Sequence, residues 1–159
     1  MNKNNPYQCQ SECKTKRCPC LKEGRACTAE CQCQQCKNPF NLIDPSVRLS
    51  DCARAHIKTM ASLTAQRLKK KYPLPCGCGN ASLNSLLTNY LCHDCDEMYY
   101  YSFCLGDVID ENSMWHCAAC ETCREDGEWH CKHCNTCTYG LTLPCENCGK
   151  KSPYAPRGL

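Results

Sequence analysis

The chain has few of the large apolar side chains from which a protein of this length normally builds its core. Its 159 residues include only two Phe and two Trp. A single hydrophobic core is therefore hard to assemble, and another source of stability is required. No apolar run approaches the ~18 residues that a membrane span needs, so we expect a soluble protein.

The beginning of the sequence also lacks the apolar stretch of a secretory signal. The polar run MNKNNPYQ precedes the first of 22 cysteines, which favours a reducing compartment over a disulfide framework. Closely spaced thiolates converge readily on one ion, so the sequence predicts a protein that folds around Zn²⁺, with about five to seven ions. Spacing alone does not distinguish zinc from an iron–sulfur cluster, which stays open.

The net charge of +3 conceals an uneven distribution along the chain. Residues 1–75 carry 14 Lys and Arg against 5 Asp and Glu, which gives +9, whereas residues 76–159 carry 5 against 11, which gives −6. A basic part followed by an acidic part predicts different partners for the two. We expect the first part to bind a polyanion and the second a protein.

Cysteine spacing and charge divide the chain into three predicted parts. Residues 1–42 form a zinc–thiolate cluster, residues 43–75 a linker and a basic amphipathic helix, and residues 76–159 an acidic multi-zinc module. The predicted fold class is thus a small, irregular, metal-stabilised protein. It would contain the cluster, one connecting α-helix and a C-terminal module of zinc knuckles or ribbons.

The predicted helix has an apolar face and a basic surface. Ser50 or Asp51 can cap it, and Pro73 ends the pattern. The apolar face recurs at steps of three or four residues: Ala53, Ile57, Met60, Thr64 and Leu68. Its basic residues either are solvated or contact phosphates, and both interpretations remain open. The run RLKKK is also a weak nuclear-import pattern and predicts a nuclear protein.

The part of the chain after Pro75 contains thirteen thiols. Three four-thiolate sites would use twelve, so either one thiol is spare or histidines such as His93, His116, His130 and His133 raise the number of sites towards four. The pairing stays open. The thiols are Cys76, Cys78, Cys92, Cys95, Cys104, Cys117, Cys120, Cys123, Cys131, Cys134, Cys137, Cys145 and Cys148.

A repeat with a spacing of fourteen residues lies within this region, where MWHCAACETC at 114–123 is followed by EWHCKHCNTC at 128–137. Repeated CxxCxxC motifs predict that neighbouring thiolates serve different ions, in a compact, interlocked unit. His116 and His130 are either ligands or hydrogen-bond partners of ligands. Trp115 and Trp129 are predicted to cover zinc sites rather than to stack on bases. Upstream, MYYYSF predicts a half-buried strand.

Eight cysteines are concentrated near the start of the chain: Cys9, Cys13, Cys18, Cys20, Cys27, Cys31, Cys33 and Cys36. Their order, with RCPC and later CKNP, resembles the CXC domains of tesmin-type proteins and of the male-specific lethal RING protein, over residues 9–39. The resemblance implies a three-zinc, nine-thiolate cluster, for which this chain is one ligand short. Cys52 is the nearest candidate to complete it and His56 the second, while a two-zinc cluster is the alternative.

The same resemblance implies binding to double-stranded DNA. Basic residues lie on short loops between the ligands, where metal binding would hold them in place: Lys14, Lys16, Arg17, Lys22 and Arg25. Arg17 stands where the male-specific lethal type carries an arginine that reaches base edges. Because arginine can form paired hydrogen bonds with guanine, Arg17 is predicted to read sequence.

Residues 117–137 are similar to the CTCHY zinc finger found beside RING domains in some ubiquitin ligases. A ligase component or a pure protein-interaction scaffold is therefore the alternative function. We predict no catalytic residue and no small-molecule substrate, because the ligand sets look closed and no phosphate-binding glycine loop is present. The main prediction is a DNA-binding subunit that docks a protein of a chromatin, DNA-modifying or recombining complex through residues 76–159.

Overall fold

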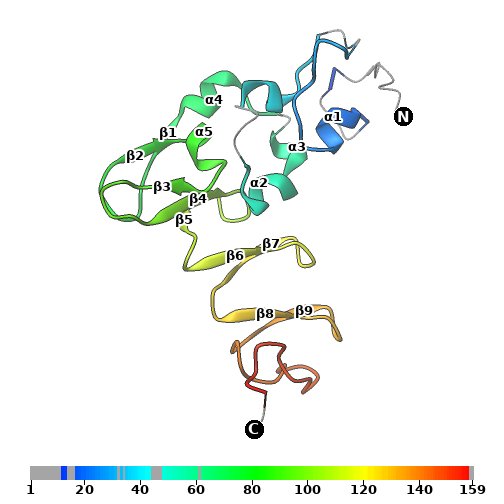
Figure 1. Cartoon of the computed structure of the whole chain (residues 1–159), viewed down its shortest axis with the longest axis vertical. Coiled ribbons are helices and arrows are strands. Elements are labelled where there is room, and N and C mark those ends of the chain that lie inside the picture. Colours follow the sequence, from blue (N-terminus) through cyan, green and yellow to red (C-terminus); the bar gives the residue numbers. More distant parts are fainter. Residues whose placement is uncertain are drawn as a thin grey trace.

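The elements of this chain are short and are connected mainly by turns. The computed structural model describes residues 12–13, 17–31, 33, 35–43, 48–60 and 62–157. Figure 1 shows a body that contains the helices and the first five strands, and two hairpins that extend from it one below the other. The prediction of a small, irregular, cysteine-rich fold is confirmed at this level.

The described helices have at most five residues, and none is long and apolar enough to cross a membrane. The helical bounds are α1 Pro19–Lys22, α2 Asp51–Ala55, α3 Ile57–Met60, α4 Ala65–Lys69 and α5 Leu83–Leu86, with a 3₁₀-helix, η1, at Pro39–Leu42. Isolated helices of this length are unstable in water. Their persistence therefore depends on the groups that they pack against.

The prediction of one continuous basic helix after the linker is wrong, because the chain forms α2, α3 and α4 instead. Ser50 caps α2 as expected. At His56 the backbone leaves the helical region, with φ −105° and ψ 42°. A new helix, α4, begins after Thr64, which is its N-cap. The Thr64 hydroxyl accepts a hydrogen bond from a backbone N–H that would donate to a backbone carbonyl in a continuous helix. The apolar face survives the breaks, since Met60 and Leu68 are buried.

The strands form four small antiparallel sheets. They are β1–β2, β3–β4–β5, β6–β7 and β8–β9. Their bounds are β1 Lys71–Pro73, β2 Asn80–Ser82, β3 Tyr90–Leu91, β4 Met98–Ser102, β5 Asp107–Asp110, β6 Met114–Cys117, β7 Thr122–Glu125, β8 Glu128–Cys131 and β9 Thr136–Tyr139. The two terminal hairpins correspond to the two copies of the sequence repeat.

Strand β4 is the predicted MYYYSF strand, but it is buried on both faces rather than on one. Tyr99 and Tyr101 belong to the main core, whereas Tyr100 packs on the other side with Cys52 and Cys123. The three tyrosines are only 3–6% exposed. A group of cysteines thus covers the face that sequence alternation assigned to solvent.

The main core of the body combines ordinary apolar residues with cysteines. It extends from Cys13 to Val108 and includes the completely buried Leu21, Met60 and Leu83. Beyond the body, the last core cluster consists of Trp129 and cysteines. The hairpins therefore have almost no hydrophobic core of their own, as the composition predicted.

Four of the CxxC turns, 92–95, 117–120, 131–134 and 145–148, are followed by a residue in the left-handed backbone region. The φ angles are 56° at Asp96, 53° at Glu121, 52° at Asn135 and 68° at Gly149. This conformation reverses the chain after the second cysteine, so that both thiols of the motif point to one side. Only glycine adopts it freely, and asparagine and aspartate tolerate it better than glutamate does.

We predict that Glu121→Gly stabilises the zinc-loaded protein by about 0.5–1 kcal/mol, because glycine reaches this φ without steric conflict. Thermal or denaturant unfolding of the full chain measures the change. The matched control is Glu125→Gly in β7, which should lower the stability by a similar amount, because glycine in a strand loses more conformational freedom on folding than other residues do. Destabilisation of the same size in both variants would contradict the prediction.

Candidate metal centres

Four groups of four Cys and His side chains lie in the body and the hairpins, with ligand atoms within 4.8 Å of one another in each group. Together they use all thirteen thiols from Cys76 onward, together with Cys52, His116 and His130. The groups are site A, Cys76, Cys78, Cys92 and Cys95; site B, Cys52, Cys104, His116 and Cys123; site C, Cys117, Cys120, His130 and Cys137; and site D, Cys131, Cys134, Cys145 and Cys148.

The distances within these groups fit a tetrahedral ion. Zn–S and Zn–N bonds of the usual length place two sulfur ligands about 3.8 Å apart, and a sulfur and a nitrogen about 3.6 Å apart. The Sγ–Sγ distances are 3.4–3.9 Å. A disulfide needs about 2.05 Å, and the described cysteines are free thiols. The donors therefore suit zinc, and four such groups agree with the prediction of several ions.

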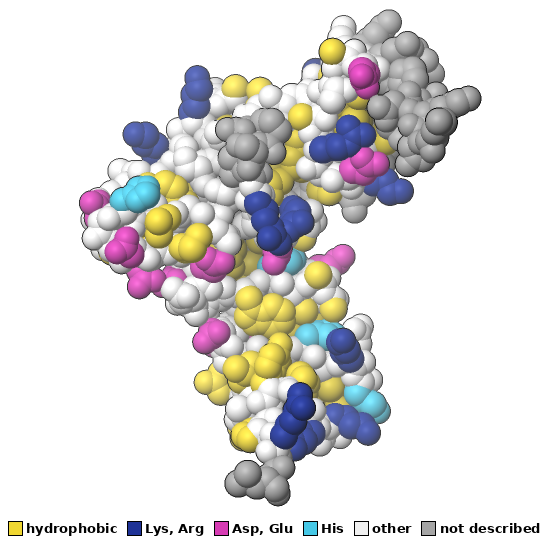
Figure 2. All heavy atoms as spheres, in the orientation of Figure 1, with side chains coloured by type: hydrophobic (Ala, Val, Ile, Leu, Met, Phe, Trp, Pro, Cys, Tyr) yellow, Lys and Arg dark blue, Asp and Glu magenta, His cyan; other side chains and the backbone are white. Residues whose placement is uncertain are grey.

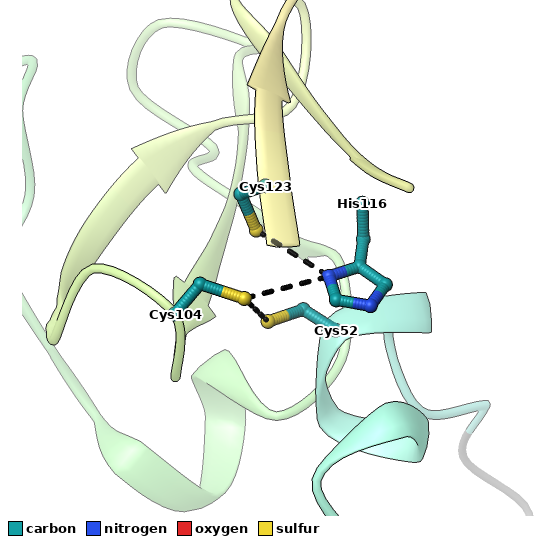
Figure 3. A group of neighbouring side chains, drawn as sticks. All are labelled: Cys52, Cys104, His116 and Cys123. Carbon is teal, nitrogen blue, oxygen red and sulfur yellow. Dashed lines mark hydrogen bonds between the residues drawn. The ribbon is translucent and has the colours of Figure 1, made fainter. Parts of the chain in front are cut away.

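Site B joins three distant segments of the chain (Figure 3). Cys52 comes from α2, Cys104 from the turn after β4, and His116 and Cys123 from opposite positions of the hairpin β6–β7. Residues directly opposite each other in an antiparallel pair present their side chains on one face. The Nδ1 atom of His116 lies 3.6 Å from Cys104 Sγ and 3.7 Å from Cys123 Sγ.

The structure does not bring Cys52 or His56 to the N-terminal cysteines that they were predicted to complete. Cys52 Sγ lies 3.8 Å from Cys104 Sγ in site B. His56 Nδ1 is 2.8 Å from the carbonyl oxygen of Cys52, and its ring stacks on Phe103 with 5.6 Å between the ring centroids. Because α2 packs against β4, both side chains face the body instead.

Strand β4 supplies hydrogen bonds to site B that the sequence reasoning missed. Ser102 Oγ donates to Cys123 Sγ at 3.1 Å, and Tyr100 donates at 3.6 Å. The hydrogen bond from Cys52 contributes most, followed by those from Ser102 and His116, to lowering the pKa of Cys123 to about 4. Tyr100 and Ser102 are two residues apart in MYYYSF, and this spacing is the sequence signal that places both side chains on one face of the strand.

The two repeats share their ligands between consecutive sites. In the first repeat, His116 and Cys123 belong to site B, whereas the CxxC pair belongs to site C. The second repeat is equivalent, with His130 and Cys137 in site C and its CxxC pair in site D. The predicted sharing of neighbouring thiols is confirmed. The sites follow one another along the chain rather than forming a compact unit, because each hairpin divides its ligands between the site before it and the site after it. The two hairpins lie one below the other (Figure 1).

Both repeat histidines point Nδ1 into their groups, which supports the ligand alternative. His130 Nδ1 lies 3.6 Å from Cys117 Sγ, 3.4 Å from Cys120 Sγ and 3.8 Å from Cys137 Sγ. The exposed His93 and His133 are in none of the four sites. Every thiol after Pro75 has a place in one of these groups, which favours the alternative with histidine ligands over a spare thiol.

The two tryptophans have different surroundings. Trp129 is 3% exposed, packs with Cys131 and Cys145 of site D, and donates from Nε1 to the carbonyl of Gly140 at 3.1 Å. The prediction that tryptophan covers a site is confirmed there. Trp115 is only partly buried and donates to the carbonyl of Glu125 at 3.1 Å. It lines a cleft beside site B.

Sites A, C and D each contain a thiol whose pKa is lowered towards or below neutrality. A hydrogen bond from the backbone N–H of Cys78 lowers the pKa of Cys76 to about 7. Burial raises the pKa of Cys120, but hydrogen bonds led by that from Cys137 lower it to about 7. In Cys145, backbone N–H groups outweigh burial and lower the pKa to about 6. Because thiolates are the metal-binding form, every site holds one ligand prepared for an ion.

Seven of the eight N-terminal cysteines lie in the described part of the chain, while Cys9, Lys14 and Lys16 lie outside it. Cys13, Cys18 and Cys27 form another group with ligand atoms within 4.8 Å. Cys20 Sγ lies 3.5 Å from Cys31 Sγ, and both Cys33 and Cys36 hydrogen-bond Cys13. The thiols therefore converge, whereas the number of ions and the nine-thiolate arrangement stay predictions.

Two asparagines support the N-terminal cluster and were not recognised from the sequence. Asn38 is 2% exposed, and its Nδ2 donates to Cys27 Sγ at 3.3 Å and to the carbonyl of Arg25 at 2.9 Å. Asn41 Nδ2 donates to Cys36 Sγ at 3.3 Å. The available signal was an asparagine before a proline and a buried phenylalanine in KNPF, which is a typical capping position.

We predict that His116→Ala and His130→Ala each remove one ion per chain, because each leaves only three ligands. His116→Cys and His130→Cys should keep the ion and, in the Co²⁺-loaded protein, raise the thiolate-to-cobalt absorption, since Cys₃His becomes Cys₄. Elemental analysis and absorption spectra measure both effects. His133→Ala is the matched control and should change neither. An unchanged ion count in both alanine variants would show that the histidines only support ligands.

We also predict that Cys52→Ser removes one ion and loosens the hairpins from the body, because site B joins α2 to β6–β7. Limited proteolysis should then increase at the exposed residues Glu111 and Asn112 between them. Cys78→Ser is the control, since it also costs one ion but in site A, away from this junction. Equal proteolysis in the two variants, or an unchanged metal content in Cys52→Ser, would contradict the role of Cys52.

No family model matches the chain, and neither the curated proteins nor the solved structures contain a significant match. The candidate centres therefore rest on the geometry of the side chains themselves.

Proposed function

We propose that the protein is a zinc-dependent DNA-binding protein, or a subunit of a DNA-binding complex. In this proposal the N-terminal cluster contacts duplex DNA and the acidic middle of the chain docks a protein partner. The observation that carries the proposal is the exposure of Arg17 and Lys22 on either side of the buried residues Cys18, Cys20 and Leu21. The net charge of +9 in residues 1–75 provides the electrostatic attraction.

Helix α1 holds these charges in place. Cys18 is its N-cap, Pro19 opens it, and Cys20 and Leu21 are buried. Arg17 and Lys22 are exposed at its two ends. Arg17 therefore lies next to two cysteines of the cluster, and little conformational entropy is lost when it contacts a base. This supports base readout by Arg17 and phosphate binding by Lys22.

Arg25 and Lys37, which also lie near the cluster, have acidic partners. Arg25 Nε lies 2.6 Å from Glu23 Oε2, and this hydrogen bond raises the pKa of Arg25. Lys37 Nζ lies 3.1 Å from Glu12 Oε2. A carboxylate partner competes with phosphate for the same cation. Arg25, one of the predicted contacts, should therefore contribute less to DNA binding than Lys22.

A second basic surface adjoins the cluster. A cleft of about 550 Å³ lies between Cys36–Leu42 and the segment from α3 to Thr64, with Lys37 on one wall and Lys58 on the other. The three short helices also expose Arg54, Arg67, Lys69 and Lys70. This arrangement supports the alternative that these residues contact phosphates, and it extends the proposed DNA surface beyond the cluster.

A second cleft supports the docking of a protein partner. It has a volume of about 790 Å³ and lies between α2 and β6, with Asp51, Glu111 and Trp115 among its walls. Its walls hold two acidic residues against one basic residue, Arg48, and residues 76–128 of the chain carry ten Asp and Glu against one Arg. A basic segment of the partner fits this charge.

We predict that a photoreactive residue in place of Asn89, which lines this cleft, crosslinks to a protein partner in cell extract. Crosslinks to nucleic acid alone would contradict docking of a protein.

We predict that the zinc-loaded protein binds duplex DNA with a steep salt dependence. Arg17→Ala should reduce the preference for the best duplex over random duplex by about tenfold, because one base contact is lost. Lys22→Ala, at the other end of the segment, should weaken binding to every duplex alike and reduce the salt slope by about one. Fluorescence anisotropy with random duplex as competitor measures both.

The two variants serve as controls for each other, since each removes one exposed cation beside the buried cysteines, Arg17 before the N-cap of α1 and Lys22 at its last residue. Equal losses on every sequence in Arg17→Ala would remove base readout. Absence of binding at low salt in the metal-loaded protein would make the cluster purely structural and would end the DNA proposal.

A further inference from the structure

The charge of the C-terminal half changes sign near Trp129. Residues 76–128 carry one basic and ten acidic residues, which gives −9, whereas residues 129–159 carry four and one, which gives +3. The two values add up to the −6 of residues 76–159. The last zinc module is therefore basic, although the region as a whole was predicted to be acidic. Figure 2 shows Lys and Arg side chains gathered on this end of the molecule.

The same end exposes aromatic and aliphatic side chains. Tyr139 and Tyr154 are each 60% exposed, and Leu143 is 57% exposed. The tyrosines of β4 in the body, by contrast, are nearly inaccessible. We use the term terminal surface for Tyr139, Leu141, Leu143, Lys150, Lys151 and Tyr154.

Hydrogen bonds hold the two segments of the terminal surface together. Ser152 is 4% exposed, and its hydroxyl donates to the carbonyl of Leu141 and accepts from the backbone N–H of Tyr154 at 3.1 Å. Cys145 of site D donates its backbone N–H to the carbonyl of Lys150 at 2.8 Å. The segment after site D is thus held against the loop that follows β9. Its hydrogen bond with Cys145 places it next to the ligands of site D.

Tyr139 forms a supported platform. A Cβ atom on Gly127 would lie 2.8 Å from Cε2 of the tyrosine ring, so the ring rests directly on the glycine backbone. Because the ring is nevertheless 60% exposed, the rest of its surface remains open to solvent. An aromatic ring held in this way can stack on a flat ligand with little loss of side-chain entropy.

Among residues 12–157 as the structure describes them, the cations of this module have no acidic partner. Lys132, Lys150, Lys151 and Arg157 form no ion pair there, in contrast to Arg25 and Lys37 near the other end. Lys151 Nζ donates only to the carbonyl of Pro156, at 3.4 Å. These charges are therefore available for phosphate groups.

We propose that the terminal surface binds single-stranded nucleic acid, with bases stacked on Tyr139 and Tyr154 and phosphates paired with Lys150 and Lys151. Exposed aromatic rings among cations are the usual platform for unpaired bases, whose faces are free, whereas a duplex hides them. An acidic peptide would satisfy the lysines but would leave the rings without a partner of matching shape. This surface is separate from the proposed duplex contact on α1, and its binding does not depend on that contact.

The test uses the full zinc-loaded chain and a labelled oligo-dT of about 15 nucleotides, the length that one small module covers. In anisotropy titrations over a salt series, the double variant Tyr139→Ala/Tyr154→Ala should bind at least tenfold more weakly with an unchanged salt slope, because stacking releases no counterions. Lys150→Ala/Lys151→Ala should reduce the slope by about 1.4.

Two controls keep loss of folding and loss of duplex binding apart from the result. Tyr139→Phe/Tyr154→Phe retains both rings and should bind as the unchanged chain does, and all variants should keep their zinc content. Lys22→Ala should leave oligo-dT binding unaffected, and the tyrosine variants should leave duplex binding unaffected.

Two outcomes would overturn the proposal. If the tyrosine-to-alanine variant binds oligo-dT normally while the lysine variant does not, the contact is merely electrostatic. If polyglutamate displaces oligo-dT at equal charge concentration, the surface is a docking site for acidic protein segments. Displacement by unlabelled oligo-dT alone, together with the loss in the tyrosine variant, would establish it.

Discussion

The convergence of thiol and imidazole groups on shared points is the constraint on which the rest of this structure depends. Helices of four or five residues and hairpins of four-residue strands have too little apolar surface to persist alone. Each is anchored because its cysteines and histidines meet those of another segment. We therefore expect folding to be coupled to metal binding in this chain, with the cores around Leu83 and Trp129 supplying the remaining stability.

Because each hairpin supplies ligands to two consecutive sites, every unit depends on the sites that precede it along the chain. Site B attaches the first hairpin to the body, site C attaches the second hairpin to the first, and site D attaches the last loop to the second. Each unit contacts mainly its neighbours, as in repeat proteins. An ion lost from site C would separate site D from the body without touching site A. A charge placed beyond site D is thus held at a defined distance from the body only while every intervening site is filled.

The sequence predicted the thiol inventory and the interlocked repeat, because spacing within a few residues limits which thiols can share an ion. It did not predict that Cys52 joins Cys104, since that choice depends on how α2 packs on β4. The continuous helix failed for a local reason, namely the capping hydroxyl of Thr64. The supporting roles of Ser102 and Asn38 were missed because a hydrogen bond to sulfur requires a particular fold and leaves little trace in composition.

The arrangement of charge connects this architecture to function. Folding on metal keeps the basic cluster and the basic terminal module at opposite ends, with the acidic middle between them (Figures 1 and 2). An unfolded chain of the same composition would allow these charges to neutralise one another. In the folded chain the consecutive sites hold the basic and acidic parts apart. Exposed charges separated by more than the Debye length of about 8 Å are largely screened from one another. We therefore expect both proposed binding surfaces to depend on the metal sites and to be lost with them.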